Sequence, residues 1–89
     1  METIFLNERV TRQQVLDSLH EFASQYPDTN AYDDWLNKGT YKFAVRFDGR
    51  LYPPKQILSM ATGIPTSDFS GGEQTNRIFR ELGFDVGDK

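Results

Sequence analysis

The hydrophobic residues between positions 11 and 26 recur every three to four residues, which is the period of a helix buried on one side. Thr11 and Gln14 have the spacing of a capping box, a common start of a helix. Pro27 cannot continue a helix and sets its end. The short apolar run Ile4–Leu6 predicts a strand or a buried arm before the helix. The side chains on the buried side are Val15, Leu16, Leu19, Phe22, Ala23 and Tyr26.

From residue 41 the pattern changes to alternation, which predicts a half-buried strand. Its apolar positions are Tyr41, Phe43, Val45 and Phe47. Asp48-Gly49 then favours a hairpin, because a type I′ turn needs positive φ at both central residues. A strict two-residue turn would pair Phe47 with Arg50 and mix apolar and charged side chains on one face. A longer or bulged turn into the returning strand Arg50–Tyr52 is therefore an alternative.

Two more helices are predicted in the last third of the chain. Pro53-Pro54 suits the first turn of a helix that ends at Gly63. Ser70 and Glu73 have the spacing of a second capping box, at the start of the last helix. The inward residues of the last helix are Thr75, Ile78, Phe79 and Leu82.

The last helix is followed by Gly83, which fits a left-handed cap, and by Phe84, which can pack back on Phe79 before an edge strand at residues 84–86. Residues 27–40 are polar and rich in turn formers, with a short helix around Trp35. We expect a small α+β domain spanning residues 1–89, with helices packed on a β-hairpin or three-stranded sheet. A winged-helix-like arrangement is one way to pack it.

The composition supports a folded domain and excludes several classes of protein. Aromatic residues make up 13% of the chain, enough for a small core. Cysteine is absent, which excludes disulfides, thiolate zinc sites and cysteine nucleophiles. No apolar run is long enough to cross a membrane, and the first residues lack the pattern of a signal peptide. We therefore expect a cytoplasmic protein without membrane association.

The residues needed for catalysis are sparse. His20 is the only histidine, and its neighbours on the predicted helix are polar or acidic, as is typical of a solvated side chain. No cluster of histidine, aspartate and glutamate has the spacing of metal ligands. The sequence therefore predicts no enzyme, no metal and no cofactor.

The charges are distributed unevenly, although the net charge is only −3. Residues 1–37 carry seven carboxylates and two arginines, whereas residues 38–55 carry five Lys or Arg and one aspartate. Two faces with different roles would produce this asymmetry. The negative net charge argues against strong non-specific binding of nucleic acid.

The glycine turn, the last helix and the hairpin carry side chains typical of a nucleic-acid surface. Ser70-Gly71-Gly72 before a helix would expose free N–H groups to a phosphate, unless the glycines only make the turn. Beyond it, Gln74, Asn76, Arg77 and Arg80 are predicted to lie on the outward side of the helix, where they can read base edges, unless they form an ordinary solvated helix face. The cations of the hairpin suit a wing along the DNA backbone, or else they protect a strand edge.

Two segments, Tyr41–Lys55 and Phe69–Asn76, together with Leu82-Gly83-Phe84, resemble the N-terminal head domain of McrA-type, modification-dependent HNH restriction endonucleases. The first segment ends in Tyr-Pro-Pro-Lys, the second reads Phe-Ser-Gly-Gly-Glu-Gln-Thr-Asn, and the similarity spans about residues 10–86. The resemblance implies a module that recognises duplex DNA carrying modified cytosine and tethers a nuclease. The HNH domain of such a nuclease is absent from this chain, so the resemblance does not imply cleavage.

The sequence thus predicts a non-catalytic DNA-binding module that reads methylated-cytosine duplexes in a restriction or defence context, with an associated nuclease domain. The resemblance implies site roles for Arg46, Tyr52, Lys55, Ser70, Gly71, Gly72, Thr75 and Asn76. The whole predicted DNA-binding set is Lys42, Arg46, Arg50, Tyr52, Lys55, Ser70, Gly71, Gly72, Gln74, Thr75, Asn76, Arg77 and Arg80. The alternative is a protein-interaction domain whose partner surface is the acidic first helix with Asp33-Asp34.

Overall fold

The computed structural model describes residues 1–26, 43–69 and 72–88, and the structural statements below refer to these ranges. The predicted short helix around Trp35 lies outside them, as do Asp33-Asp34, Tyr41, Lys42, Ser70 and Gly71. The elements in chain order are β1 (Glu2–Phe5), β2 (Glu8–Thr11), α1 (Arg12–Gln25), β3 (Phe43–Phe47), β4 (Arg50–Tyr52), α3 (Pro54–Thr62), the 3₁₀ turn η2 (Thr66–Asp68), α4 (Glu73–Glu81) and β5 (Asp85–Asp88).

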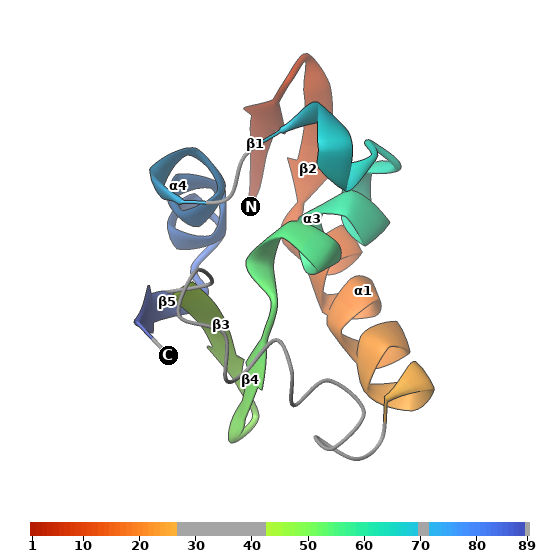
Figure 1. The fold of residues 1–89 in the computed structure, drawn as a ribbon. Helices are drawn as coiled ribbons and strands as arrows, with labels where there is room; N and C mark the ends of the chain where they lie inside the picture. Colours follow the sequence, from red (N-terminus) through yellow and green to blue (C-terminus); the bar gives the residue numbers. More distant parts are fainter. Residues whose placement is uncertain (27–42, 70–71, 89) are drawn as a thin grey trace.

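These elements form a small α+β domain, which confirms the predicted fold class. The described residues contain three α-helices, a two-stranded antiparallel sheet of β1 and β2, and a three-stranded antiparallel sheet in the order β4-β3-β5. In Figure 1 the β1–β2 hairpin lies at one end of the molecule and the three-stranded sheet at the other. Helices α1 and α3 pack against each other, and α4 packs against β1 and β5. The winged-helix-like packing stays a prediction.

The β1–β2 hairpin is the element that the sequence pattern indicated least well. A strand at Ile4–Leu6 was one alternative, but its partner Glu8–Thr11 was not predicted. The two strands pair through a two-residue turn in which Leu6 and Asn7 have φ of 49° and 67°. Leucine rarely adopts positive φ, so the turn carries no sequence signal.

Helix α1 follows its predicted pattern except at Tyr26, which was predicted to be buried but is exposed because it lies past the last helical residue. The Thr11 hydroxyl accepts the backbone N–H of Gln14, and the Gln14 side chain accepts the backbone N–H of Thr11, which confirms the capping box. The helix ends at Gln25, before Pro27. Val15, Ser18, Leu19 and Phe22 are its buried residues.

The β3–β4 turn has two residues, so the alternative of a longer or bulged turn is wrong. Asp48 and Gly49 have φ of 52° and 78°, and Phe47 pairs with Arg50 in register. Arg50 fits beside the aromatic residues because its guanidinium lies over the Tyr52 ring, 5.3 Å from the centroid, and donates to the Tyr26 carbonyl at 2.8 Å. The predicted final strand is confirmed as β5, which pairs antiparallel with β3.

The two remaining helices begin at different kinds of residue. Pro54 occupies the first turn of α3, and Gly63 ends it with φ of 80°, as predicted. The predicted capping box of Ser70 and Glu73 would make Ser70 the N-cap of α4. The N-cap is instead Gly72, two residues later, so that prediction was wrong. The side chain of Glu73 instead pairs with Arg80.

The core joins both sheets to the helices. The inward residues of α4 are fully buried as predicted, and Phe84 packs on Phe79 with ring centroids 6.3 Å apart. The Phe84 N–H donates to the Phe79 carbonyl, which closes the left-handed cap at Gly83. Among the helices of the described ranges, none has the length and apolar character needed to cross a membrane.

Candidate nucleic-acid interface

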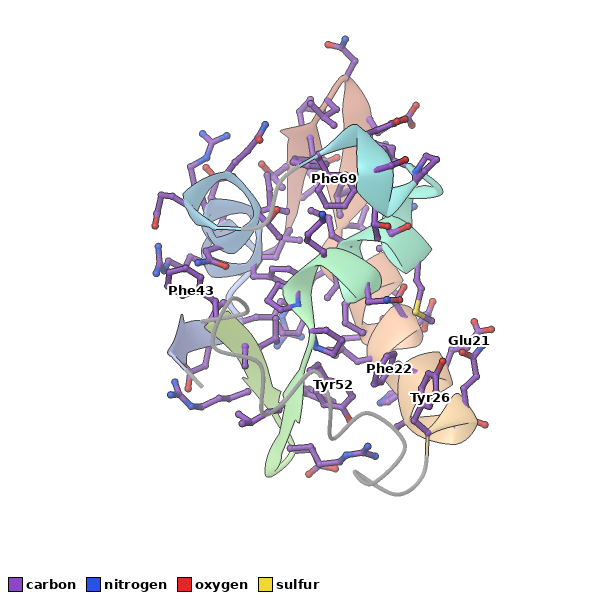
Figure 2. All side chains as sticks on the ribbon, in the orientation of Figure 1. Glu21, Phe22, Tyr26, Phe43, Tyr52 and Phe69 are labelled. Atoms are coloured by element: carbon purple, nitrogen blue, oxygen red, sulfur yellow. The ribbon has the colours of Figure 1, made fainter. Side chains whose placement is uncertain are left out.

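The two sequence segments that carry the family resemblance meet in space. Lys55, in the first turn of α3, places its ammonium over the ring of Phe69, 5.7 Å from the centroid. Phe69 packs edge-on against Phe5 at 5.1 Å and lies between the β1–β2 hairpin and α3 in Figure 2. Gly72, the N-cap of α4, follows three residues later. We call Lys55, Phe69, Gly72 and the first N–H groups of α4 the α3–α4 junction.

Lys55 keeps an available positive charge at this junction. Its side chain is half-buried, and no carboxylate lies within ion-pair distance of it in the described part of the chain. A cation–π contact of this kind contributes about 0.5–1 kcal/mol. It orients the ammonium without neutralising it, so Lys55 can still bind an anion.

The N-terminal end of α4 supplies backbone donors that follow Phe69 closely in the chain. Gly72 has φ of 100° and ψ of −149°, a region that is open almost only to glycine. Its carbonyl accepts the N–H of Asn76 at 2.9 Å, and the N–H groups of Glu73 and Gln74, which precede this first intrahelical bond, have no acceptor within the helix. Gly72 also contributes no capping side chain. The positive end of the helix is therefore not capped by Gly72 itself, and it favours a negative ligand.

The outward face of α4 is electrically balanced. Gln74, Arg77 and Arg80 are exposed, as predicted. However, Arg80 pairs with Glu73 at 2.7 Å, and Arg77 lies 3.9 Å from Glu81. A phosphate on this face would meet one carboxylate for each arginine.

Thr75, Asn76 and Tyr52 belong to the interior rather than to the surface. Thr75 and Asn76 have exposed fractions of 0%, and Tyr52 of 3%. Asn76 was predicted to point outward, which is wrong, because this side of α4 is covered. Figure 2 shows Tyr52 next to Phe22, with ring centroids 5.7 Å apart. The structure therefore offers no exposed surface of these three residues for direct contact with DNA.

Asn76 has an unusual environment for a buried side chain. Neither its Oδ1 nor its Nδ2 has a hydrogen-bond partner. A buried amide without partners costs about 1–3 kcal/mol for each group left unbonded. The first turn of α4 is therefore less stable than it would be with an apolar residue at this position.

The two hairpin arginines that the structure describes, Arg46 and Arg50, do not share a face of the sheet. Arg46 is exposed on one face of the sheet and lies 3.6 Å from Asp85, with its guanidinium against Gly87. Arg50 is paired in register with Phe47, so it lies on the opposite face, against Tyr26 and Tyr52. Only Arg46 of this pair extends away from the aromatic face.

No group of three His, Asp or Glu side chains able to hold a metal ion occurs in the ranges that the structure describes. His20 is exposed, and its ring lies 6.0 Å from that of Phe47.

Comparison with known proteins gives a family match that includes the residues of the α3–α4 junction. The family model of the ScoMcrA-like N-terminal head domain matches residues 8–88. The match contains both segments that meet at Lys55 and Phe69. A search of curated proteins and a search of solved structures each found no match. Since the family model covers nearly the whole chain, the chain belongs to the ScoMcrA-like N-terminal head domain family.

Proposed function

We propose that this chain is a non-catalytic DNA-binding module that contacts duplex phosphates at the α3–α4 junction. The observation that carries the proposal is the position of Lys55. This cation has no carboxylate partner in the described ranges and lies over the ring of Phe69, three residues before Gly72, the N-cap of α4. A lysine and the positive end of a helix each favour a phosphate, so the proposal assigns both to the same contact.

Arg46 supplies a second contact in this proposal. Its ion pair with Asp85 is long and open to solvent, with side-chain exposures of 47% and 68%. Exposed pairs of this kind contribute about 0–1 kcal/mol, so a DNA phosphate can displace the carboxylate. Arg77 and Arg80 have a smaller role, because the glutamates of α4 stay beside them.

Membership of the head-domain family supports the finer part of the proposal. The family match agrees with the resemblance to McrA-type restriction endonucleases, and that resemblance implies recognition of duplexes that carry modified cytosine, with cleavage performed by an associated nuclease domain. We propose this specificity for the present chain in a restriction or defence context.

Fluorescence anisotropy with three matched duplexes tests the proposal: unmodified, 5-methylcytosine and 5-hydroxymethylcytosine. We expect binding to at least one of them at low salt, with an affinity that falls as salt rises. Lys55→Ala should weaken binding about tenfold, the effect expected for one charged contact. Arg77→Ala is the matched control, because Arg77 is exposed on the outward face of α4 and has Glu81 beside it. Absence of binding to every duplex would contradict the proposal.

A protein-interaction domain is the second candidate, and one observation favours it. Asp17 and Glu21 lie one turn apart on α1, are exposed, and have no cation within ion-pair distance in the described ranges. Their hydrogen bonds from Gln13 and Gln25 leave the negative charges in place. Recovery of a protein partner that no longer binds after Asp17→Asn with Glu21→Gln, together with no duplex binding, would favour this function.

A further inference from the structure

A pocket beside the β1–β2 hairpin has no role in the proposed DNA contact at the α3–α4 junction. It has a volume of about 450 Å³ and lies where the β1–β2 hairpin meets the start of α1. None of its lining residues belongs to the α3–α4 junction. The lining residues are Met1, Glu2, Arg9, Thr11, Arg12, Gln13 and Leu16.

Arg12 is the main donor in this pocket. Its guanidinium lies over the ring of Phe84, 4.9 Å from the centroid, and its side chain is half-buried. No hydrogen bond or ion pair engages this guanidinium in the described part of the chain. Gly83 lies against it, because a Cβ on Gly83 would be 3.8 Å from Arg12 Nε. The guanidinium is therefore held on an aromatic ring with its N–H groups unused.

The other polar groups of the pocket are already engaged. Arg9 pairs with Glu2, and Gln13 donates to Asp17. The backbone N–H of Arg12 donates to the Met1 carbonyl, and Thr11 caps Gln14. The start of α1 is thus largely satisfied, and a ligand would be bound chiefly by the side chain of Arg12.

The electrostatic balance of the lining favours an anion. Two arginines face one carboxylate, and that carboxylate is neutralised by Arg9. Arginine presents two parallel N–H groups that match the oxygens of a phosphate. These groups lie at the edge of the guanidinium plane, so stacking of the plane on an aromatic ring leaves them free to donate. The volume is in the range of small-molecule sites.

We propose that the Arg12 pocket binds a phosphate-class oxyanion, with the Arg12 guanidinium as the bidentate donor. The site is separate from the proposed DNA contact at Lys55 and does not depend on it. The phosphate is either free, as inorganic phosphate or a mononucleotide, or part of a nucleic-acid backbone.

An NMR titration of the whole chain with inorganic phosphate, at ionic strength held constant with chloride, tests this proposal. We expect the Arg12 Nε–Hε resonance to shift and saturate with a dissociation constant on the order of 1 mM, as suits one bidentate contact in an open site. Arg12→Lys should weaken binding at least about tenfold, because the lysine ammonium keeps the charge but lacks the two parallel N–H groups of arginine. Arg77→Lys, on the outward face of α4, should leave the affinity unchanged.

A non-saturating shift, or equal affinity in Arg12→Lys and wild type, would overturn the proposal. A second variant covers the case in which Arg12→Lys fails to fold. Glu2→Gln keeps Arg12 and removes the only carboxylate of the lining, so it should tighten phosphate binding, and equal or weaker binding would contradict the assignment.

The source of the phosphate is decided by two further ligands. A mononucleotide that binds more tightly than inorganic phosphate, with duplex affinity unchanged in Arg12→Lys, identifies a free ligand. A decrease of duplex affinity in Arg12→Lys identifies a nucleic-acid backbone. Lys55→Ala should leave the Arg12 shift intact, so failure of the DNA proposal and failure of this one give different results.

Discussion

The outward face of α4 and the α3–α4 junction both carry positive side chains, but only at the junction is the charge free. Arg77 and Arg80 each have a glutamate of the same helix within ion-pair distance. Lys55 has the ring of Phe69 instead of a carboxylate. An aromatic ring fixes a cation in place without cancelling its charge, whereas a carboxylate does both.

The difference shows that the availability of a charge depends on its neighbours in the fold. The outward face of α4 has the residue types of a groove-reading helix, yet its two arginines and two glutamates compensate one another. The junction has a single lysine, but it holds this cation over the ring of Phe69 without a carboxylate partner in the described ranges. We therefore expect the junction to dominate phosphate binding.

The largest expected effect concerns the ring that supports Lys55. Phe69→Ala should lower the free energy of unfolding by about 3 kcal/mol, because Phe69 is buried and packs on Phe5. Arg77→Ala, on the outward face of α4, should change it by less than about 0.5 kcal/mol. Urea unfolding followed by circular dichroism measures both. Similar values for the two variants would show that the junction is no more part of the core than the helix face.

A smaller effect on stability is expected inside α4. Asn76→Leu removes a buried amide whose oxygen and nitrogen have no partner, so it should raise the free energy of unfolding by about 1 kcal/mol. Thermal unfolding should then shift upward by about 4–8 °C for a domain of this size. Asn76→Asp serves as the matched control, and it should be strongly destabilising because it buries a charge. A fall in stability for Asn76→Leu would mean that the amide is bonded in solution.

The smallest expected effect sharpens the electrostatic part of the comparison. Glu73→Gln frees Arg80 and removes a carboxylate from the first turn of α4, so it should tighten duplex binding about two- to threefold. It should also lower stability by about 0.3–1 kcal/mol, since an acidic residue there favours the helix dipole. Anisotropy and urea unfolding report the two changes. Weaker duplex binding would indicate that Glu73 supports the contact rather than opposing it.

The sequence predicted the elements whose ends carry distinctive residues. The capping box at Thr11, the Asp48-Gly49 turn, the proline start of α3 and the left-handed cap at Gly83 all form as expected. Each of these residues is restricted or favoured by local backbone geometry alone. The β1–β2 hairpin was missed because Leu6 and Asn7 adopt positive φ without a glycine.

The candidate site was less predictable, because helical spacing does not reveal what covers a helix. Helical spacing was sufficient to predict that Thr75 is buried. Asn76 lies at the flank of the same helix face, so its burial depends on tertiary packing. Arg12 also gave no signal, since the ring of Phe84 that holds it is far away in sequence. The two faces of the hairpin became clear only with the register of Phe47 and Arg50.

The salt dependence of duplex binding tests the central comparison most directly. The slope of log K against log salt becomes shallower by about 0.9 for each phosphate that the protein no longer neutralises. Measured side by side, Lys55→Ala should reduce the slope by about this amount, and Arg77→Ala should leave it nearly unchanged. A reduced slope in Arg77→Ala with an unchanged slope in Lys55→Ala would contradict the account and assign phosphate binding to the outward face of α4.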